Sequence, residues 1–296
     1  MVAQPRAETP PADRSGLCTA ALSVLLVIVL ILIWEGAKAF GAANNYAINL
    51  GSTTVDLSIL NDTQLPHLSE IIQSFAEPAQ RNGAPLYQML IQSGAYTFLA
   101  ALRGFLIGGV IGFALAILFA HSALLQRGLL PFVVASQTVP VLAIAPMVVI
   151  WMAKIGAIDW SVPIIAAYLT FFPVVIYTLR GLTSVPETSL ELMQTYAASR
   201  WQILIKLRIP NALPQIFTAL KISATASVVG AIIGELPSGI QNGLGIAILN
   251  FSRFYNQSPS RLWATIIASG LLGILFFCAI AGIERLVVRW KVEESQ

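Results

Sequence analysis

Charged residues are scarce in this chain: 10% of its 296 residues are Asp, Glu, Lys or Arg, whereas 56% are hydrophobic. Soluble globular proteins carry about 25% charged residues. A chain with so little charge has too few polar side chains to cover a water-exposed surface. The composition therefore excludes an ordinary soluble enzyme and predicts a protein embedded in lipid.

Cysteine and histidine are also rare. Cys18 and Cys278 both fall inside apolar stretches, which excludes a disulfide framework and a CxxC metal pair. His67 and His121 have no clustered ligand residues near them in the sequence. We therefore expect neither a metal site nor a cofactor.

An ATP-binding signature is missing as well. The pattern G-x-x-x-x-G-K-[ST], whose backbone cradles phosphates, does not occur, and the dipeptide Gly-Lys is found nowhere. We expect that the chain is not an enzyme and that any nucleotide-driven step uses another polypeptide.

Long apolar stretches, in contrast, are abundant. A spanning helix needs about 20 mainly apolar residues. Six stretches meet this need: 15–34, 104–127, 128–153, 160–179, 215–236 and 262–283. Lys221 lies near one end of the fifth stretch, and we expect it to extend its ammonium group to the membrane interface. The first stretch exceeds the roughly 7–15 apolar residues of a secretory signal and is predicted to be an uncleaved anchor. The sequence thus predicts an all-α membrane protein with about six transmembrane helices.

The orientation follows from Lys and Arg, which are enriched in cytoplasmic loops. With the N-terminus inside, most of these residues are cytoplasmic: Arg6, Arg14, Arg127, Arg180, Arg200, Lys206, Arg208, Lys221, Arg285, Arg289 and Lys291. Fewer face outward: Lys38, Arg81, Lys154, Arg253 and Arg261. Arg103 falls just inside the second stretch and fits neither side. Both termini are predicted to be cytoplasmic, and the dispersed charge argues against nucleic-acid binding.

Two patterns predict packing. Gly104, Gly108 and Gly112 recur every four residues, which places small residues on one helix face so that another helix can approach closely. In the long outward segment, residues 66–77 predict a short amphipathic helix that lies on the membrane surface or packs against the spans.

A polar loop at 180–214 separates the fourth and fifth stretches. Thr188 with Glu191, and Ser199 with Gln202, each fit the capping box that begins a helix. We expect two short helices with a turn near 197–198, followed by a bend toward the fifth span at Pro210 and Pro214. Composition leaves two interpretations open, a capped hairpin without a partner and a platform for another protein.

The run 191–202 (ELMQTYAASRWQ), followed by 208–214 (RIPNALP), resembles the EAA motif of ATP-binding cassette (ABC) importer permeases. Residues 139–146 (VPVLAIAP) and 243–245 (GLG) are similar to the nitrate, sulfonate and taurine branch, and the resemblance covers 96–289, about two thirds of the chain. Leu192 and Met193 replace the alanines of the motif, and Ala197 replaces its glycine. If the turn needs a left-handed backbone, alanine there costs about 1 kcal/mol.

The resemblance implies a type I ABC importer permease fold in the bacterial inner membrane. It assigns contact with the ATPase to the following residues: Glu191, Ala197, Ala198, Ser199, Arg200, Pro210 and Pro214. The implied partners are a cytoplasmic ABC ATPase, a second permease copy in a homodimer, a periplasmic or lipid-anchored substrate-binding protein, and membrane lipid. The expected organisation is a disordered cytoplasmic tail (1–16), a first transmembrane helix (17–36), an external segment (37–92), a transport domain (93–290) with a coupling loop (181–214), and a cytoplasmic tail (291–296).

Substrate and pathway are less constrained. Residues 196–199 and 234–248 are more similar to permeases for thiamine-precursor pyrimidines such as hydroxymethylpyrimidine, and a nitrate, sulfonate or taurine-type substrate is the alternative. Gln137, Thr138 and Glu235 are polar residues within the spans, so they line the translocation pathway or make packing hydrogen bonds. A rival class, the ion-coupled secondary transporter, predicts internal repeats and paired intramembrane charges. We find neither pattern in the sequence.

Overall fold

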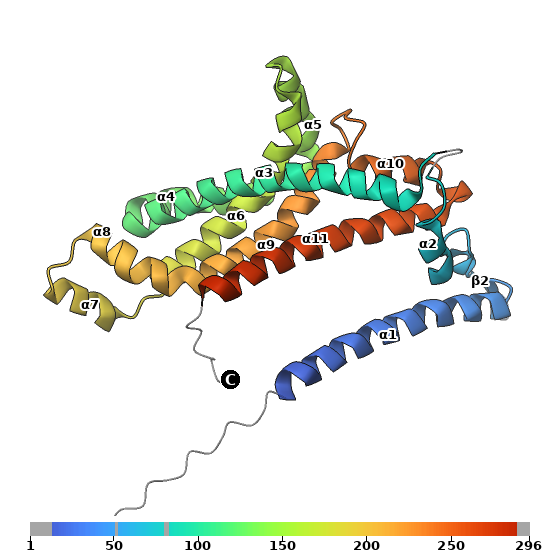
Figure 1. The fold of residues 1–296 in the computed structure, drawn as a ribbon, viewed down its shortest axis with the longest axis horizontal. Coiled ribbons are helices and arrows are strands. Elements are labelled where there is room, and N and C mark those ends of the chain that lie inside the picture. Colours follow the sequence, from blue (N-terminus) through green and yellow to red (C-terminus); the bar gives the residue numbers. More distant parts are fainter. Residues whose placement is uncertain (1–13, 51–52, 80–82, 289–296) are drawn as a thin grey trace, which may run out of the picture.

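The structure is a computed structural model that describes residues 14–50, 53–79 and 83–288, with side chains from residue 21 onward except at 48–55. Helices dominate these ranges (Figure 1). The α-helices are α1 (Arg14–Ala43), α2 (Leu68–Ser74), α3 (Leu86–His121), α4 (Ala123–Ser136), α5 (Val141–Lys154), α6 (Ser161–Thr183), α7 (Glu187–Thr195), α8 (Arg200–Ile203), α9 (Ile209–Glu235), α10 (Leu244–Arg253) and α11 (Pro259–Val287). The strands seen within the described ranges are β1 (Ala47–Leu50) and β2 (Thr53–Asp56), a small antiparallel hairpin.

Five helices in the described part of the chain are long and apolar enough to cross a membrane. A sixth span exists if α4 and α5, which meet at an angle of 96°, are counted together. The third predicted stretch, 128–153, is therefore not one continuous helix. The predicted count of about six is confirmed on this basis.

Several predicted boundaries are wrong. Helix α1 begins at Arg14, inside the expected tail, and continues to Ala43, while α3 begins at Leu86 rather than at 104. The apolar-stretch criterion stopped at Arg103, yet the helix continues outward because its outer half is buried by neighbouring helices. The Arg103 guanidinium lies 5.9 Å from the centre of the Trp160 ring, a cation–π contact at the outer end of α6. Arg6, Arg81, Arg289, Lys291 and the tails beyond 14 and 288 lie outside the described residues.

The glycine spacing in α3 produces the predicted close approach, and the partner is α6. A Cβ atom added at Gly104 would lie 2.4 Å from the Ala166 Cβ, and one added at Gly108 would lie 2.5 Å from the Ala167 carbonyl oxygen. At Gly112 the same atom would lie 2.7 Å from a backbone oxygen of α6. Side chains of any size at these positions would push α3 and α6 apart.

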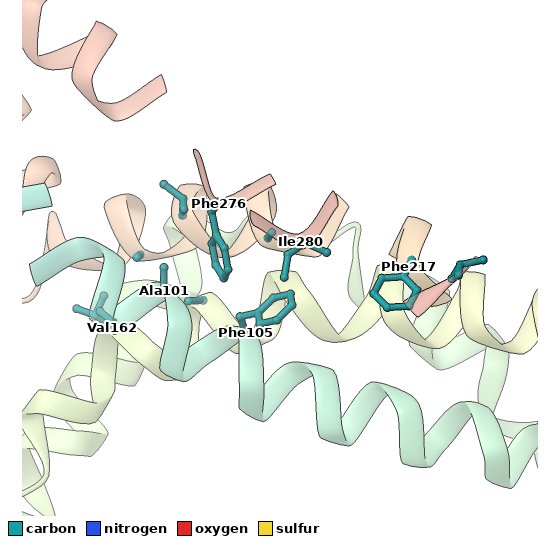
Figure 2. Packing of buried hydrophobic residues seen from close by; sticks show 12 residues of the cluster. Ala101, Phe105, Val162, Phe217, Phe276 and Ile280 are labelled. Carbon is teal, nitrogen blue, oxygen red and sulfur yellow. The ribbon is translucent and has the colours of Figure 1, made fainter. Parts of the chain in front are cut away.

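The main apolar cluster joins α3, α6, α9 and α11. Figure 2 shows Ala101 and Phe105 of α3 beside Phe276 and Ile280 of α11, with Phe217 of α9 farther along the cluster. The Phe105 and Phe276 rings meet edge to face, with centroids 5.1 Å apart. Aromatic pairs in this arrangement contribute about 0.5–1.5 kcal/mol beyond the area they bury. This cluster holds the bundle around α9.

Helix α1 diverges from the bundle and is attached at its outer end (Figure 1). The Lys38 Nζ donates to the Asp62 carboxylate over 2.6 Å, and this bond lowers the pKa of Asp62. Glu35 pairs with His67 over 2.7 Å, and the Trp34 indole donates to the Pro66 carbonyl. The Trp34 ring also packs edge to face on Trp263 of α11, with centroids 4.9 Å apart. The attachment therefore combines polar contacts with one aromatic contact, while the apolar shaft of α1 remains exposed.

The two ends of the molecule differ as the charge distribution predicts. Helix α2, the β-hairpin and α10 lie at one end, and α7 and α8 lie at the other, toward which α1 begins and α11 ends (Figure 1). The predicted short external helix is confirmed as α2, whose Ile71 is buried in a cluster with Leu86 and Leu244. It packs against the spans.

Candidate functional site

The cytoplasmic loop forms a helical hairpin made of α7 and α8. Helix α7 ends in a Schellman motif, in which the Ala198 N–H donates to the Met193 carbonyl over 3.0 Å and the Ala197 N–H donates to the Gln194 carbonyl over 2.8 Å. Ala197 takes the left-handed conformation that this motif requires, with φ of 52°. The suspected left-handed turn is therefore present, and an alanine occupies it.

The start of α7 differs from the prediction. The helix begins at Glu187, after Pro186 at the N-cap position, and no side chain caps it. Thr188 thus lies inside the first turn, and the predicted capping box with Glu191 is wrong. Proline suits the position just before a helix because it has no N–H to leave unpaired and because it disfavours helical backbone at the residue that precedes it. Pro186, two residues before Thr188, therefore sets the start of α7, and the Thr188–Glu191 pattern does not.

The second capping box is confirmed. The Ser199 hydroxyl accepts from the Gln202 N–H over 3.3 Å, and the Gln202 side-chain oxygen accepts from the Ser199 N–H over 2.8 Å. We had expected the helix that begins here to stop before the fifth span, but it does not. It passes through a π-helical turn (Leu204–Arg208) into α9, so that Arg200–Glu235 forms one span. The wider π turn precedes Pro210, whose ring is accommodated at the beginning of α9.

The base of the hairpin is fastened to the bundle. The Arg208 guanidinium donates to the Ala120 carbonyl at the end of α3 over 3.0 Å. The Asn211 amide donates to the Ser184 hydroxyl beyond α6 over 3.2 Å. Leu204 is buried in a cluster with Phe119 and other residues of α3 and α6. Any movement of the loop is therefore passed to three spans.

The tip of the hairpin is open to solvent. Leu192 and Tyr196, one turn apart on α7, are 57% and 76% exposed. Trp201 is 66% exposed, and the carboxylate of Glu191 has no ion pair or hydrogen bond with another described residue. We call Glu191, Leu192, Tyr196 and Trp201 the docking face. Exposed apolar groups of this kind mark interaction surfaces.

The remaining predicted contact residues lie at different depths. Ser199 and Arg200 are exposed beside the docking face, as is Ala197, whereas Ala198 is partly buried. Pro210 and Pro214 are partly buried within α9, away from the tip.

Ala197 offers a direct test of the turn. Replacing Ala197 with glycine is expected to stabilise the hairpin by about 0.5–1 kcal/mol, because glycine adopts positive φ without a steric cost. Hydrogen exchange of the amides in 187–203 should slow in Ala197→Gly. In the matched control, Ala198→Gly, the replaced residue has negative φ, and exchange should accelerate. Faster exchange in Ala197→Gly would contradict this account of the turn.

Glu235, one of the three pathway candidates, is fully buried at the outer end of α9. One carboxylate oxygen accepts from the Thr97 hydroxyl over 2.7 Å, and the other accepts from the Gly245 N–H over 2.7 Å. The Thr97 oxygen in turn accepts from the Leu244 N–H over 2.9 Å. These bonds form a clamp that joins α3, α9 and the first turn of α10, and the carboxylate faces no open space within this subunit.

The sequence motif around Gly243 is explained by this clamp. Gly243 has φ of 120°, and a Cβ added there would lie 2.4 Å from the Glu235 carboxyl carbon. A Cβ at Gly245 would lie 2.4 Å from the Ile232 carbonyl oxygen. The run 243–245 had been noted as a motif, but Thr97 carried no signal, because its contact with Glu235 joins residues far apart in the chain.

Gln137 and Thr138 lie together at the break between α4 and α5, and both are exposed. Glu235 is not exposed with them but is buried in the clamp at the outer end of α9. The structure therefore brings two of the three pathway candidates together and separates the third.

Lys221 does not extend to the interface as predicted. Its Nζ lies 2.7 Å from the Glu284 carboxylate of α11, and the two side chains are 19% and 8% exposed. The statement that the spans contain no paired charges is therefore wrong. The pair escaped notice because α9 and α11 become neighbours only in the folded bundle.

Comparison with known families gives a direct match. The family described as "Binding-protein-dependent transport system inner membrane component" matches residues 108–289, more than half of the chain. The chain belongs to this family. It is a multi-pass permease subunit of an ABC importer in the bacterial inner membrane, and this family implies an ATPase and a substrate-binding protein as partners.

Individual permeases agree with this assignment. The chain is 35% identical to the formylaminopyrimidine transport permease ThiX of Halalkalibacterium halodurans, over 62% of this chain and 72% of that protein. It is 32% identical to the riboflavin transport system permease RibX of Chloroflexus aurantiacus, over 69% and 74%. The putative aliphatic sulfonates transport permease SsuC of Bacillus subtilis is 26% identical over 90% and 87%.

A solved structure confirms the fold. The MetNI methionine ABC transporter in an inward-facing conformation contains a chain that matches this permease with a TM-score of 0.52 and 20% identity. The match covers 69% of this permease and 96% of that chain. This likeness supports the type I importer fold.

Proposed function

We propose that two copies of this permease form the pathway for a small, flat nitrogen heterocycle, which an external binding protein delivers. Hydrolysis takes place on a separate ATPase that docks on α7 and α8, and this subunit has no ATP site of its own. Among the relatives named above, the two above 30% identity are permeases for formylaminopyrimidine and for riboflavin. A sulfonate-type substrate is the alternative, since SsuC matches over more of the chain.

This proposal rests on one observation: the hairpin of α7 and α8, which we call the docking hairpin, continues directly into a span. Arg200–Glu235 is one helical unit, with the docking hairpin at its inner end and the Glu235 clamp at its outer end. A rigid helix transmits displacement along its length, so an ATPase that pulls the docking face moves the outer ends of α3 and α10 as well. Glu191, Ser199 and Arg200 form the proposed contact, and Ala197 and Ala198 set the angle of the turn.

The proposed division of the chain follows from these roles. Residues 93–290 form the transport domain, with 181–214 as its coupling loop, and 37–92 face the binding protein. Helix α4 has no buried residue within one subunit, which supports its contact with a second copy. Gln137 and Thr138 line the pathway beside this face, whereas Glu235 acts as a structural clamp.

Reconstitution in proteoliposomes tests the proposal. The permease alone should hydrolyse no ATP, and the complete importer with its ATPase and binding protein should take up labelled hydroxymethylpyrimidine or riboflavin in an ATP-dependent manner. Taurine and nitrate serve as the comparison substrates. ATP hydrolysis by the pure permease would refute the division of labour, and uptake confined to taurine or nitrate would refute the substrate class.

A further inference from the structure

The break between α4 and α5 lies deep in the membrane. Tyr168 of α6 donates its hydroxyl to the Ser136 carbonyl, which fixes the break beside the middle of that helix. Tyr168 is 10 residues after the first residue of the apolar segment Ile158–Thr183. At a rise of 1.5 Å per residue, it lies about 15 Å from the outer end, close to the centre of a hydrocarbon core about 30 Å thick.

Non-helical backbone at this depth needs a polar neighbourhood. Residues 137–140 are all exposed on this subunit and belong to neither helix. The N–H groups of 137–139 donate within turns, but the carbonyl oxygens of these three residues accept no hydrogen bond from another described residue. Unpaired backbone groups facing lipid tails cost several kcal/mol each, so such segments occur where they line an aqueous cavity or are covered by protein. The break is therefore expected to face a pathway rather than lipid.

Beside the break lies a pocket of about 340 Å³, lined by both polar and apolar groups. The aromatic side chains of Tyr168, Phe171 and Phe172 form the wall contributed by α6, and Gln137 and Pro140 face them from the break. The Tyr168 and Phe171 rings are tilted against each other with centroids 6.0 Å apart. Because its hydroxyl is bound to Ser136, Tyr168 holds α6 and the break at a fixed spacing.

Gln137 is the polar group in this pocket with free hydrogen-bonding capacity. Its side chain makes no hydrogen bond with another described residue, whereas the hydroxyls of Ser136 and Tyr168 already donate to backbone carbonyls. A carboxamide offers a donor and an acceptor side by side. This pair matches a ring nitrogen next to an exocyclic amino group, or an adjacent carbonyl and N–H.

The lining also argues against charged substrates. Among the residues that the structure describes, no Lys, Arg or His lines the pocket. A nitrate or sulfonate group would enter it without a counter-charge, and an unpaired charge in an apolar setting is strongly disfavoured. Aromatic walls instead favour stacking with a flat ring.

We propose that this pocket, which we call the elbow pocket, is a substrate-binding station halfway across the membrane that accepts neutral, flat nitrogen heterocycles. Phe171 and Phe172 stack on the ring, and the Gln137 amide binds its edge. The station rests on the proposed function, and it adds a selectivity step in the permease to that of the external binding protein.

The test uses the complete importer in proteoliposomes with labelled hydroxymethylpyrimidine and riboflavin. Gln137→Leu is expected to lower uptake about tenfold for the substrate that the wild type transports. This is the loss expected from one hydrogen bond. Phe172→Leu should reduce it several-fold. ATP hydrolysis without binding protein should stay at the wild-type rate in both, since neither residue contacts the docking hairpin. Gln257→Leu and Phe277→Leu make the same changes at exposed positions outside the elbow pocket and outside α4, and these variants should transport normally.

Three results would overturn the station. Wild-type uptake in both pocket variants would remove it and leave the proposed function intact. An equal loss in the Gln257→Leu and Phe277→Leu controls, or a parallel loss of basal ATP hydrolysis, would assign the pocket residues to packing. Failure of the wild-type importer to transport either heterocycle, with uptake of taurine or nitrate instead, would refute the proposed substrate class before any variant is compared.

Discussion

Replacing Lys221 with methionine is expected to lower the free energy of unfolding by about 1.5–3 kcal/mol, because it removes the ammonium group that lies 2.7 Å from the largely buried Glu284 carboxylate. Glu284→Gln should cost less, since the neutral amide can still accept from the ammonium group. The double variant Lys221→Met/Glu284→Leu should be about as stable as the less stable of the two single variants, because the attraction between Lys221 and Glu284 is lost once either charge is removed. Thermal and denaturant unfolding in lipid nanodiscs would measure these differences.

The matched control is Lys206→Met, which removes an exposed lysine from the same stretch of helix. Exposed charges contribute little to stability, so its effect should stay below about 1 kcal/mol. If Lys221→Met were as mild as this control, or if the double variant were less stable than both single variants, α9 and α11 would not be joined by a buried ion pair.

Replacing Glu191 with glutamine is expected to weaken binding of the ATPase about 10- to 100-fold, since a desolvated hydrogen bond to a charged group contributes about 1.5–3 kcal/mol. A capping role would have predicted almost no effect. Because α7 begins at Glu187 with Pro186 at its N-cap, the carboxylate of Glu191 does not complete a capping box. The exposed charge is therefore free to meet a partner.

Glu187→Gln provides the comparison for this experiment. It removes an exposed carboxylate from the first turn of the same helix, one turn away from Glu191. Binding of the purified ATPase to the permease in nanodiscs, together with uptake by the complete importer, should decline in Glu191→Gln and change little in Glu187→Gln. Equal binding in the wild type and Glu191→Gln would show that the charge makes no contact with the ATPase.

Proline shows how far local sequence reasoning reaches. Pro131, Pro140 and Pro146 lie within one predicted span, and each removes a backbone donor in the same way. Pro131 and Pro146 remain inside α4 and α5, and the chain breaks before Pro140. The break coincides with the Ser136 carbonyl, which accepts from Tyr168 of another helix. The Ser136 carbonyl also accepts from the Val139 N–H over 3.3 Å, so a local turn and a neighbouring helix together hold the break at Pro140.

Local patterns were sufficient where the responsible atoms are close in sequence. The apolar stretches predicted the number of spans, and the Ser199–Gln202 box was predicted directly. A left-handed turn at Ala197 was considered as a condition, and it is present. Apolar span length and helix capping depend on residues that are contiguous in the chain, so the sequence alone determined that this protein is a helical membrane protein with a capped polar hairpin. The permease family followed from the resemblance of the hairpin motif.

The tertiary structure decided the partners of the buried polar groups. Glu235 meets Thr97 across 138 positions, and Lys221 meets Glu284 of α11. A polar side chain in a span must find a partner, but its identity depends on which helices become neighbours. Small differences in packing among α3, α6, α9 and α11 set those neighbours, so the clamp, the ion pair and the elbow pocket emerged only when the helices were placed together.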